Sequence, residues 1–293
     1  MTSRPARIVD AHVHLWDPAR TDWYPYLSAG QAQLNMGDVS GMSRRFDVPT
    51  YRRETDGWNV TKLINVAAAS GRHSINETLE LDRRADADAD ADGHPNAIIG
   101  GLAPTDSIAE TVADLDRQMA APRFRGVRPM GAFTGPLPPT GVLRALKERG
   151  LVFEVMAHAD QLLVAAEGLE RHGDLVVVVE HAGWPRNGSD EERALWAAGI
   201  NALAGLGHNV LCKLSGLAMP LRSMSVDVLA PWLEHVIDAF GVDRCLFASN
   251  FPVDGIHGSF DELYTAYSAI TSGLGDEARD KLFAANAERI YRC

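Results

Sequence analysis

The sequence predicts a single-domain (β/α)8 barrel, in which eight parallel strands alternate with helices. Short runs rich in Val, Ile and Leu recur eight times along the 293 residues, and segments with helical periodicity separate them. The runs are evenly spaced, and no change in composition divides the chain. Because 46% of the residues are hydrophobic, a large core can form. We therefore expect one α/β domain over residues 1–293 and not a doubly wound sheet.

The predicted strands are short, nearly continuous apolar runs, as is typical of strands that are buried on both faces. Their even distribution along the chain is the argument for one closed barrel. They cover residues 7–12, 62–68, 97–102, 126–129, 152–157, 175–180, 209–214 and 244–248.

Helical periodicity is clearest in seven segments between and after these strands. Asp190, Ser225 and Asp276 stand at expected helix starts, where a short acceptor or an acid satisfies free N–H groups. The predicted helices cover residues 107–120, 141–149, 160–172, 190–206, 225–240, 259–271 and 276–291.

Two segments depart from this alternation. Residues 17–56 form a connection rich in Pro and Gly that is too long for an ordinary loop, so we expect it to lie over the active-site face. Residues 85–93 read ADADADADG and are expected to be a solvated helix end or loop without chemistry.

Charge and composition exclude several functional classes. The chain has 28 Lys and Arg against 39 Asp and Glu, a net charge of −11, which argues against nucleic-acid binding. It contains no apolar run of membrane-spanning length and no signal-like start, so we expect a cytoplasmic protein that binds no membrane. The three cysteines have no CxxC spacing, which argues against a thiolate zinc site. The expected partner is a small-molecule substrate, and a homo-oligomer is left open.

Four histidines fall at the ends of predicted strands, where the active sites of such barrels lie. His12 and His14 end the first strand two residues apart, so both side chains can face the same side. They could share a divalent cation, polarise a substrate carbonyl, or form a hydrogen-bonded core pair. Because His158 and His181 follow two other strands, a functional histidine cluster becomes the better interpretation.

Charged residues also occur inside predicted strands, where burial requires a partner of opposite charge. Arg128 could hold a substrate carboxylate or a developing oxyanion, whereas Lys213 would supply a compact point charge. Glu154 shares a strand face with His158 and could be an inward carboxylate. For these residues the alternative is structural pairing inside the barrel, such as Glu154 with Lys213.

Six segments together resemble the amidohydrolase superfamily of TIM barrels, in the right order from about residue 8 to residue 292. The resemblance is strongest to its branch of metal-dependent hydrolases, which includes lactonases of pyrone dicarboxylates and of sugar acids. The segments read IVDAHVHLWDP, FRGVRPM, EHAGWP, NVLCKLSGL, RCLFASNFPVDG and LFAANAERIYR.

The resemblance implies that His12, His14 and His181 hold one divalent cation, with zinc as the expected ion. Arg128, His158 and Trp16 are the expected substrate-binding residues, and Arg128 and Lys213 are expected to stabilise negative charge during catalysis.

The eighth-strand motif departs from the family, because Asn250 stands where the family has an aspartate that serves as metal ligand and general base. A neutral amide can form hydrogen bonds but cannot accept a proton, so we expect Asp254 to be the base, with a histidine as the other option. The loss of an anionic ligand also leaves a metal-free route open.

The preferred function is a hydrolase that opens a lactone or related cyclic ester of a small, anionic substrate with an activated water. One alternative is a zinc-dependent, non-oxidative decarboxylase of an aromatic or muconate-type acid. Another is a catalytically silent small-molecule binder. The substrate itself is set by the 17–56 segment and the other loops at the barrel mouth, which carry no readable code.

Overall fold

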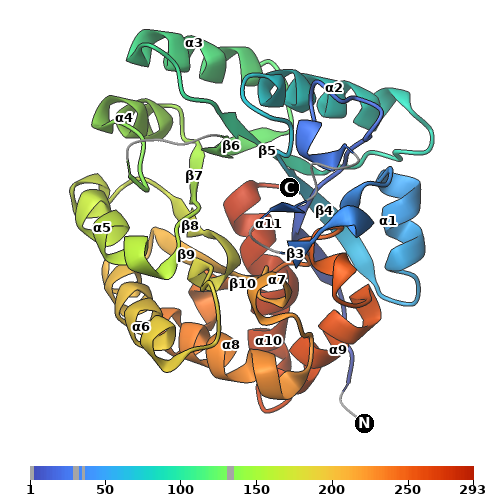
Figure 1. Ribbon diagram of the computed structural model, residues 1–293, viewed down its shortest axis with the longest axis vertical. Helices are drawn as coiled ribbons and strands as arrows, with labels where there is room; N and C mark the ends of the chain where they lie inside the picture. Colours follow the sequence, from blue (N-terminus) through green and yellow to red (C-terminus); the bar gives the residue numbers. More distant parts are fainter. Residues whose placement is uncertain (1–2, 29–32, 35–36, 131–134) are drawn as a thin grey trace.

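The computed structural model describes residues 3–28, 33–34, 37–130 and 135–293. Eight strands form one parallel sheet in sequence order, and this sheet curls into a barrel that is ringed by helices (Figure 1). All eight predicted strands are confirmed. They are β1 (Ile8–Val13), β4 (Val60–Val66), β5 (Ala97–Leu102), β6 (Phe124–Pro129), β7 (Val152–Val155), β8 (Val177–Val179), β9 (Val210–Leu214) and β10 (Cys245–Phe247).

The seam between β1 and β10 closes through residues beyond the end of β10. Val13 forms a parallel bridge with Phe251, and the backbone N–H of Asn250 donates to the carbonyl of His12 at 2.9 Å. Buried Asp10 supports this seam, since its Oδ1 accepts the N–H of Ser249 at 2.8 Å. Residues 12–14, which contain His12 and His14, and residues 249–252 (SNFP) are far apart in the sequence but lie side by side at the barrel mouth.

The seven predicted helices are confirmed, with small shifts at their ends. They are α3 (Ile108–Gln118), α4 (Thr140–Glu148), α5 (Ala159–Leu169) with a short turn η3 (Glu170–His172), α6 (Asp190–Gly205), α8 (Val226–Phe240), α9 (Phe260–Ile270), and a last segment of α10 (Asp276–Asp280), η7 (Lys281–Ala285) and α11 (Asn286–Tyr291).

One of the three predicted cap residues occupies the N-cap position, although its side chain forms no capping hydrogen bond. Ser225 precedes α8, whereas Asp190 and Asp276 are the first residues of α6 and α10. Ser189 is the cap of α6, and its side chain accepts the N–H of Glu192.

The structure adds one long helix, α2 (His73–Ala87), that periodicity did not reveal. Its buried face is largely polar and includes Ser74, Glu77, Thr78 and Asp82, so no apolar stripe marks it in the sequence. The helix ends within the Ala–Asp repeat, which confirms that 85–93 begins as a helix end.

The 17–56 segment carries its own small elements, and α7 (Ala218–Leu221) lies in another loop. The elements of the segment are η1 (Pro25–Leu27), β2 (Gln33–Leu34), β3 (Gly37–Asp38), η2 (Ser40–Met42) and α1 (Val48–Glu54). Trp16 and Phe46 exchange two backbone hydrogen bonds, which anchor the segment to the end of β1. Tyr26 and Met42 of this segment line the cavity at the barrel mouth.

The barrel interior is a packed core made of Val, Ile, Leu and Ala side chains from the strands. Tyr291 of α11 joins this core from below, and its hydroxyl donates to Glu154 Oε1 at 2.6 Å. In the part of the chain that the structure describes, no helix is long and apolar enough to cross a membrane.

Candidate active site

The structure brings His12, His14 and His181 together at the ends of β1 and β8. The Nε2 atoms of His12 and His14 are 3.2 Å apart, and the ring centroids of His12 and His181 are 4.5 Å apart. All three rings are buried. Three of the four histidines predicted at strand ends therefore lie together in the folded chain.

The hydrogen-bond partners assign the protons of two of these rings. His14 Nδ1 lies 2.8 Å from the Val66 carbonyl, so it carries a proton, and its Nε2 accepts from His12 Nε2. His12 Nδ1 is then free to accept from Lys213 Nζ at 3.4 Å. Burial, together with nearby Arg128, lowers the pKa of His14 to about 3, and burial holds the pKa of His12 and His181 well below the usual value. The three rings are neutral near pH 7.

Left-handed backbone conformations concentrate at this site. Four of the seven non-glycine residues with positive φ among the described residues are His181, Ala182, Trp184 and Asn250. Such conformations cost energy and persist where surrounding structure holds them, frequently at functional sites. The turn η4 (Glu180–Gly183) after β8 thereby aims His181 inward.

A buried ion pair lies beneath the histidines. Lys213 Nζ donates to both oxygens of Glu154, at 2.8 and 2.6 Å, and neither side chain is exposed to solvent. The structural pairing left open in the sequence is therefore present. Lys213 also touches His12, so this pair supports the histidine cluster from below.

Arg128 and Glu180 form a second charged pair, and Glu180 is a residue that the sequence reasoning missed. Arg128 Nη2 lies 3.3 Å from Glu180 Oε2. Burial raises the pKa of Glu180 to about 8, because the attraction of Arg128 only partly offsets the loss of water and nearby Glu154 raises the pKa further. An acid at the end of the run LVVVVE, directly before His181, was the available signal.

Buried polar atoms without hydrogen-bond partners gather around the same cluster. Four of the ten such atoms among the described residues are Arg128 Nε, both oxygens of Glu180 and Asp254 Oδ2. Because buried polar groups are normally satisfied, such a concentration is typical of a site that binds a ligand.

A group of His12, Glu180 and His181 could hold a metal ion. One ligand atom from each residue lies within 4.8 Å of the others. Two imidazoles and a carboxylate are a common ligand set for catalytic zinc, and the free Glu180 oxygens fit that role. Glu180 could therefore supply the anionic ligand that Asn250 cannot. His14 lies beside this group and stays a predicted ligand.

Asp254 is fully buried and does not lie on a surface turn. Its Oδ1 accepts Asn250 Nδ2 at 2.9 Å. Burial raises the pKa of its carboxyl to about 7, and the hydrogen bond from Asn250 opposes this rise. Asn250 lines the cavity, whereas Asp254 does not, so the carboxylate predicted to be the base lies behind the Asn250 amide to which it is hydrogen-bonded.

A cavity of about 520 Å³ opens above the cluster. Trp16 and Arg128 line it, as expected for substrate-binding residues, beside four methionines from four different loops. His158 does not line it. Its ring stacks on Trp184, and its Nδ1 lies 3.0 Å from the Trp184 carbonyl. Because Trp184 lines the cavity and His158 packs against it, His158 would affect a bound substrate only through the position of Trp184.

The family model for amidohydrolases matches residues 9–293 of this chain, nearly its whole length. The chain belongs to the amidohydrolase family. This amidohydrolase is 30% identical to the uncharacterized protein y4mH of Sinorhizobium fredii, covering 97% of this chain and 98% of that protein. It is 26% identical to L-fucono-1,5-lactonase of Burkholderia multivorans, covering 97% of this chain and 95% of that enzyme.

Solved structures agree with this assignment. A crystal structure of an amidohydrolase from Burkholderia multivorans with bound zinc has a TM-score of 0.79 at 25% identity, covering 98% of this amidohydrolase and 99% of that chain. A probable 2-pyrone-4,6-dicarboxylic acid hydrolase from Acinetobacter baumannii has a TM-score of 0.69 at 14% identity, covering 98% and 99% of the two chains. The second likeness shows the fold alone. The resemblance read from the six segments is confirmed at the level of family and fold.

Proposed function

We propose that this amidohydrolase opens a lactone of a small, polar or anionic substrate by attack of water on the carbonyl carbon. The observation that carries the proposal is the floor of the cavity, where Arg128, with a free Nε–H, lies beside His14 and His181, and where Glu180 and Asp254 are buried behind this lining. The lactonase names of relatives that match along the whole chain support this class of reaction.

Arg128 fits the charge that develops during the reaction. Water attack turns the carbonyl oxygen into an oxyanion, and a fixed cation in a dry cavity stabilises such an oxygen strongly. The cavity floor offers Arg128 for this role, while Lys213 acts from below through His12. Arg128 could also hold a carboxylate of the substrate.

Asp254 is the proposed base. It accepts a proton from water while the water oxygen bonds to the carbonyl carbon, and it returns that proton to the ring oxygen when the ring C–O bond breaks. Asn250 holds one oxygen of this carboxyl and leaves Oδ2 free for the proton.

We also propose that His12, Glu180 and His181 hold one zinc ion. When bound there, zinc would polarise the carbonyl or lower the pKa of a water. The Arg128 and Asp254 roles stand without it.

A panel of purified compounds tests the proposal. We expect acid release from sugar-acid 1,5-lactones in a pH-stat and no CO₂ release from hydroxylated aromatic acids. Arg128→Gln should lower kcat/KM by about 10² or more, while Arg44→Gln, which changes an arginine outside the cavity, should not. CO₂ release without lactone opening would favour the decarboxylase, and no turnover of either class would favour the silent binder.

A further inference from the structure

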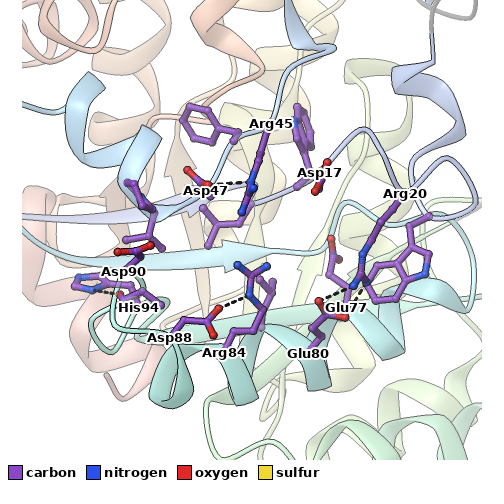
Figure 2. A pocket seen from close by; sticks show the side chains of 18 of the residues that line it. Asp17, Arg20, Arg45, Asp47, Glu77, Glu80, Arg84, Asp88, Asp90 and His94 are labelled. Atoms are coloured by element: carbon purple, nitrogen blue, oxygen red, sulfur yellow. Dashed lines mark hydrogen bonds and ion pairs between the residues drawn. The ribbon is translucent and has the colours of Figure 1, made fainter.

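A second cavity, of about 450 Å³, lies outside the barrel between the 17–56 segment and α2 (Figure 2). One wall comes from residues 15–24 and 45–49, and the other from α2 and the Ala–Asp repeat that follows it. Among the residues that the structure describes, Trp16 is the one that lines both this cavity and the one above the histidines. Its volume is in the range of small-molecule sites.

The charges around this outer cavity leave an excess of carboxylates. Three arginines line it, and each pairs with an acid of the same cavity: Arg20 with Glu80 at 2.7 Å, Arg45 with Asp47 at 3.0 Å, and Arg84 with Asp88 at 2.7 Å.

Three further acids of the cavity wall, Asp17, Glu77 and Asp90, pair with no Lys or Arg in the part of the chain that the structure describes. Glu77 is buried and instead accepts hydrogen bonds from Tyr24 and from the backbone of Ala68 and Ala69. Figure 2 shows arginines and carboxylates on both sides of the hollow. A bound cation would offset part of this excess of negative charge.

The floor of the outer cavity is aromatic and apolar. Trp16, Tyr24 and Phe46 line it and are buried. Nearby, the Arg20 guanidinium lies 4.2 Å from the centre of the Trp23 ring, so this wall already carries a cation on an aromatic face. An occupant with an apolar body and a positive group would match both the floor and the rim.

We propose that this outer cavity binds a small organic amine with an apolar body, with its ammonium group toward Asp17, which adjoins the aromatic floor, and with Asp90 adding negative charge at the opposite side of the hollow. The amine would rest its hydrocarbon part on Trp16 and Phe46. The proposal does not depend on which reaction takes place in the barrel, although the two cavities have Trp16 in common.

Three probes of one shape and different charge test the proposal by calorimetry at low ionic strength: phenethylamine, 2-phenylethanol and phenylacetate. We expect phenethylamine to bind at least about fivefold more tightly than the neutral alcohol, and phenylacetate to bind most weakly. An amine that binds no better than the alcohol, tighter binding of phenylacetate, or no binding of any probe would overturn it.

Two variants locate the binding. Ala89→Trp fills the cavity from its exposed rim and should weaken phenethylamine binding about tenfold or more. Asp17→Asn with Asp90→Asn should weaken it about fivefold, whereas Asp22→Asn with Asp106→Asn, which removes the same charge from exposed positions outside the cavity, should not.

All three variant proteins should keep the thermal midpoint and lactonase rate of the wild type. Unchanged amine affinity in both Ala89→Trp and Asp17→Asn with Asp90→Asn would place the amine elsewhere and contradict the proposal.

Discussion

Asp254 is the proposed proton acceptor of the reaction. Asp254→Asn should lower kcat by about 10² or more, because general-base catalysis contributes that much. Since burial raises the pKa of its carboxyl to about 7, the wild-type kcat/KM should rise with pH up to about 7 and then level off. A pH–rate profile of both proteins checks this, and the variant should lack the rise. Asn250→Asp should be tolerated.

Near-normal turnover of Asp254→Asn, with the same pH dependence as the wild type, would move the base to a histidine. As the folding control, Asp254→Asn should give the same near-ultraviolet circular dichroism spectrum as the wild type. The burial of Asp254 could not be predicted from sequence, because it depends on how the segment after β10 folds back onto Gly216 and Ala218.

Glu180 should govern metal content. We expect about one equivalent of zinc in protein purified without chelator, and a loss of affinity of about tenfold or more in Glu180→Gln, because one of three ligands is removed. Metal analysis and a competition titration with a chelator measure this. His158→Gln is the matched control, since His158 lies outside the ligand group. Equal zinc affinity in Glu180→Gln and wild type would contradict the ligand assignment.

Lys213 should stabilise the folded protein through its buried ion pair with Glu154. Lys213→Met leaves a buried carboxylate without its cation and should cost about 3–5 kcal/mol of unfolding free energy. The double variant Lys213→Met with Glu154→Met removes both charges and should recover most of this loss. Urea unfolding of the single and double variants measures it, and a single variant as stable as wild type would refute the account of this pair.

Elements could be predicted well wherever an apolar pattern marks them. The continuous runs of β4, β5 and β8 were visible as strands, and amphipathic α3 and α4 were visible as helices. α2 was not, because Glu77 and Asp82 on its buried face hydrogen-bond to backbone N–H groups of Ala68, Ala69 and Arg123, which a sequence pattern does not show. The turn η4 was missed because two of its three residues with positive φ, His181 and Ala182, are not glycines.

The loop after β9 should hold His181 in place. A Cβ on Gly216 would lie 2.3 Å from the His181 ring, and φ is +68° there. Gly216→Ala should therefore cost about 2–4 kcal/mol and lower kcat. Gly150→Ala is the matched control, with φ of +63° and no atom within 4 Å, and should cost about 1–2 kcal/mol with unchanged kcat. Equal effects of both substitutions would mean that the His181 contact is unimportant.

At the scale of the whole molecule, the order of the strands and helices along the chain was enough to predict the barrel. Eight evenly spaced βα units leave few arrangements other than a ring of parallel strands. The seam and the outer cavity could not be predicted, because both arise from contacts between segments that are far apart in sequence, such as Val13 with Phe251 and Arg20 with Glu80.

The chain should unfold as one unit. The interior core is continuous around the sheet, and the C-terminal Tyr291 joins it to Glu154. We expect far-ultraviolet dichroism and tryptophan fluorescence to report the same urea midpoint. Two separated transitions would contradict the prediction of a single domain over residues 1–293.

Water attack on a lactone carbonyl is the central claim, and one isotope experiment tests it most directly. The enzyme is allowed to hydrolyse a sugar-acid 1,5-lactone in H₂¹⁸O, and the product is analysed by mass spectrometry. The hydroxy acid should carry one ¹⁸O atom in its carboxylate and none in its hydroxyl groups. Product with ¹⁸O in the new hydroxyl, or no hydroxy acid from any lactone while an aromatic acid releases CO₂, would contradict the account.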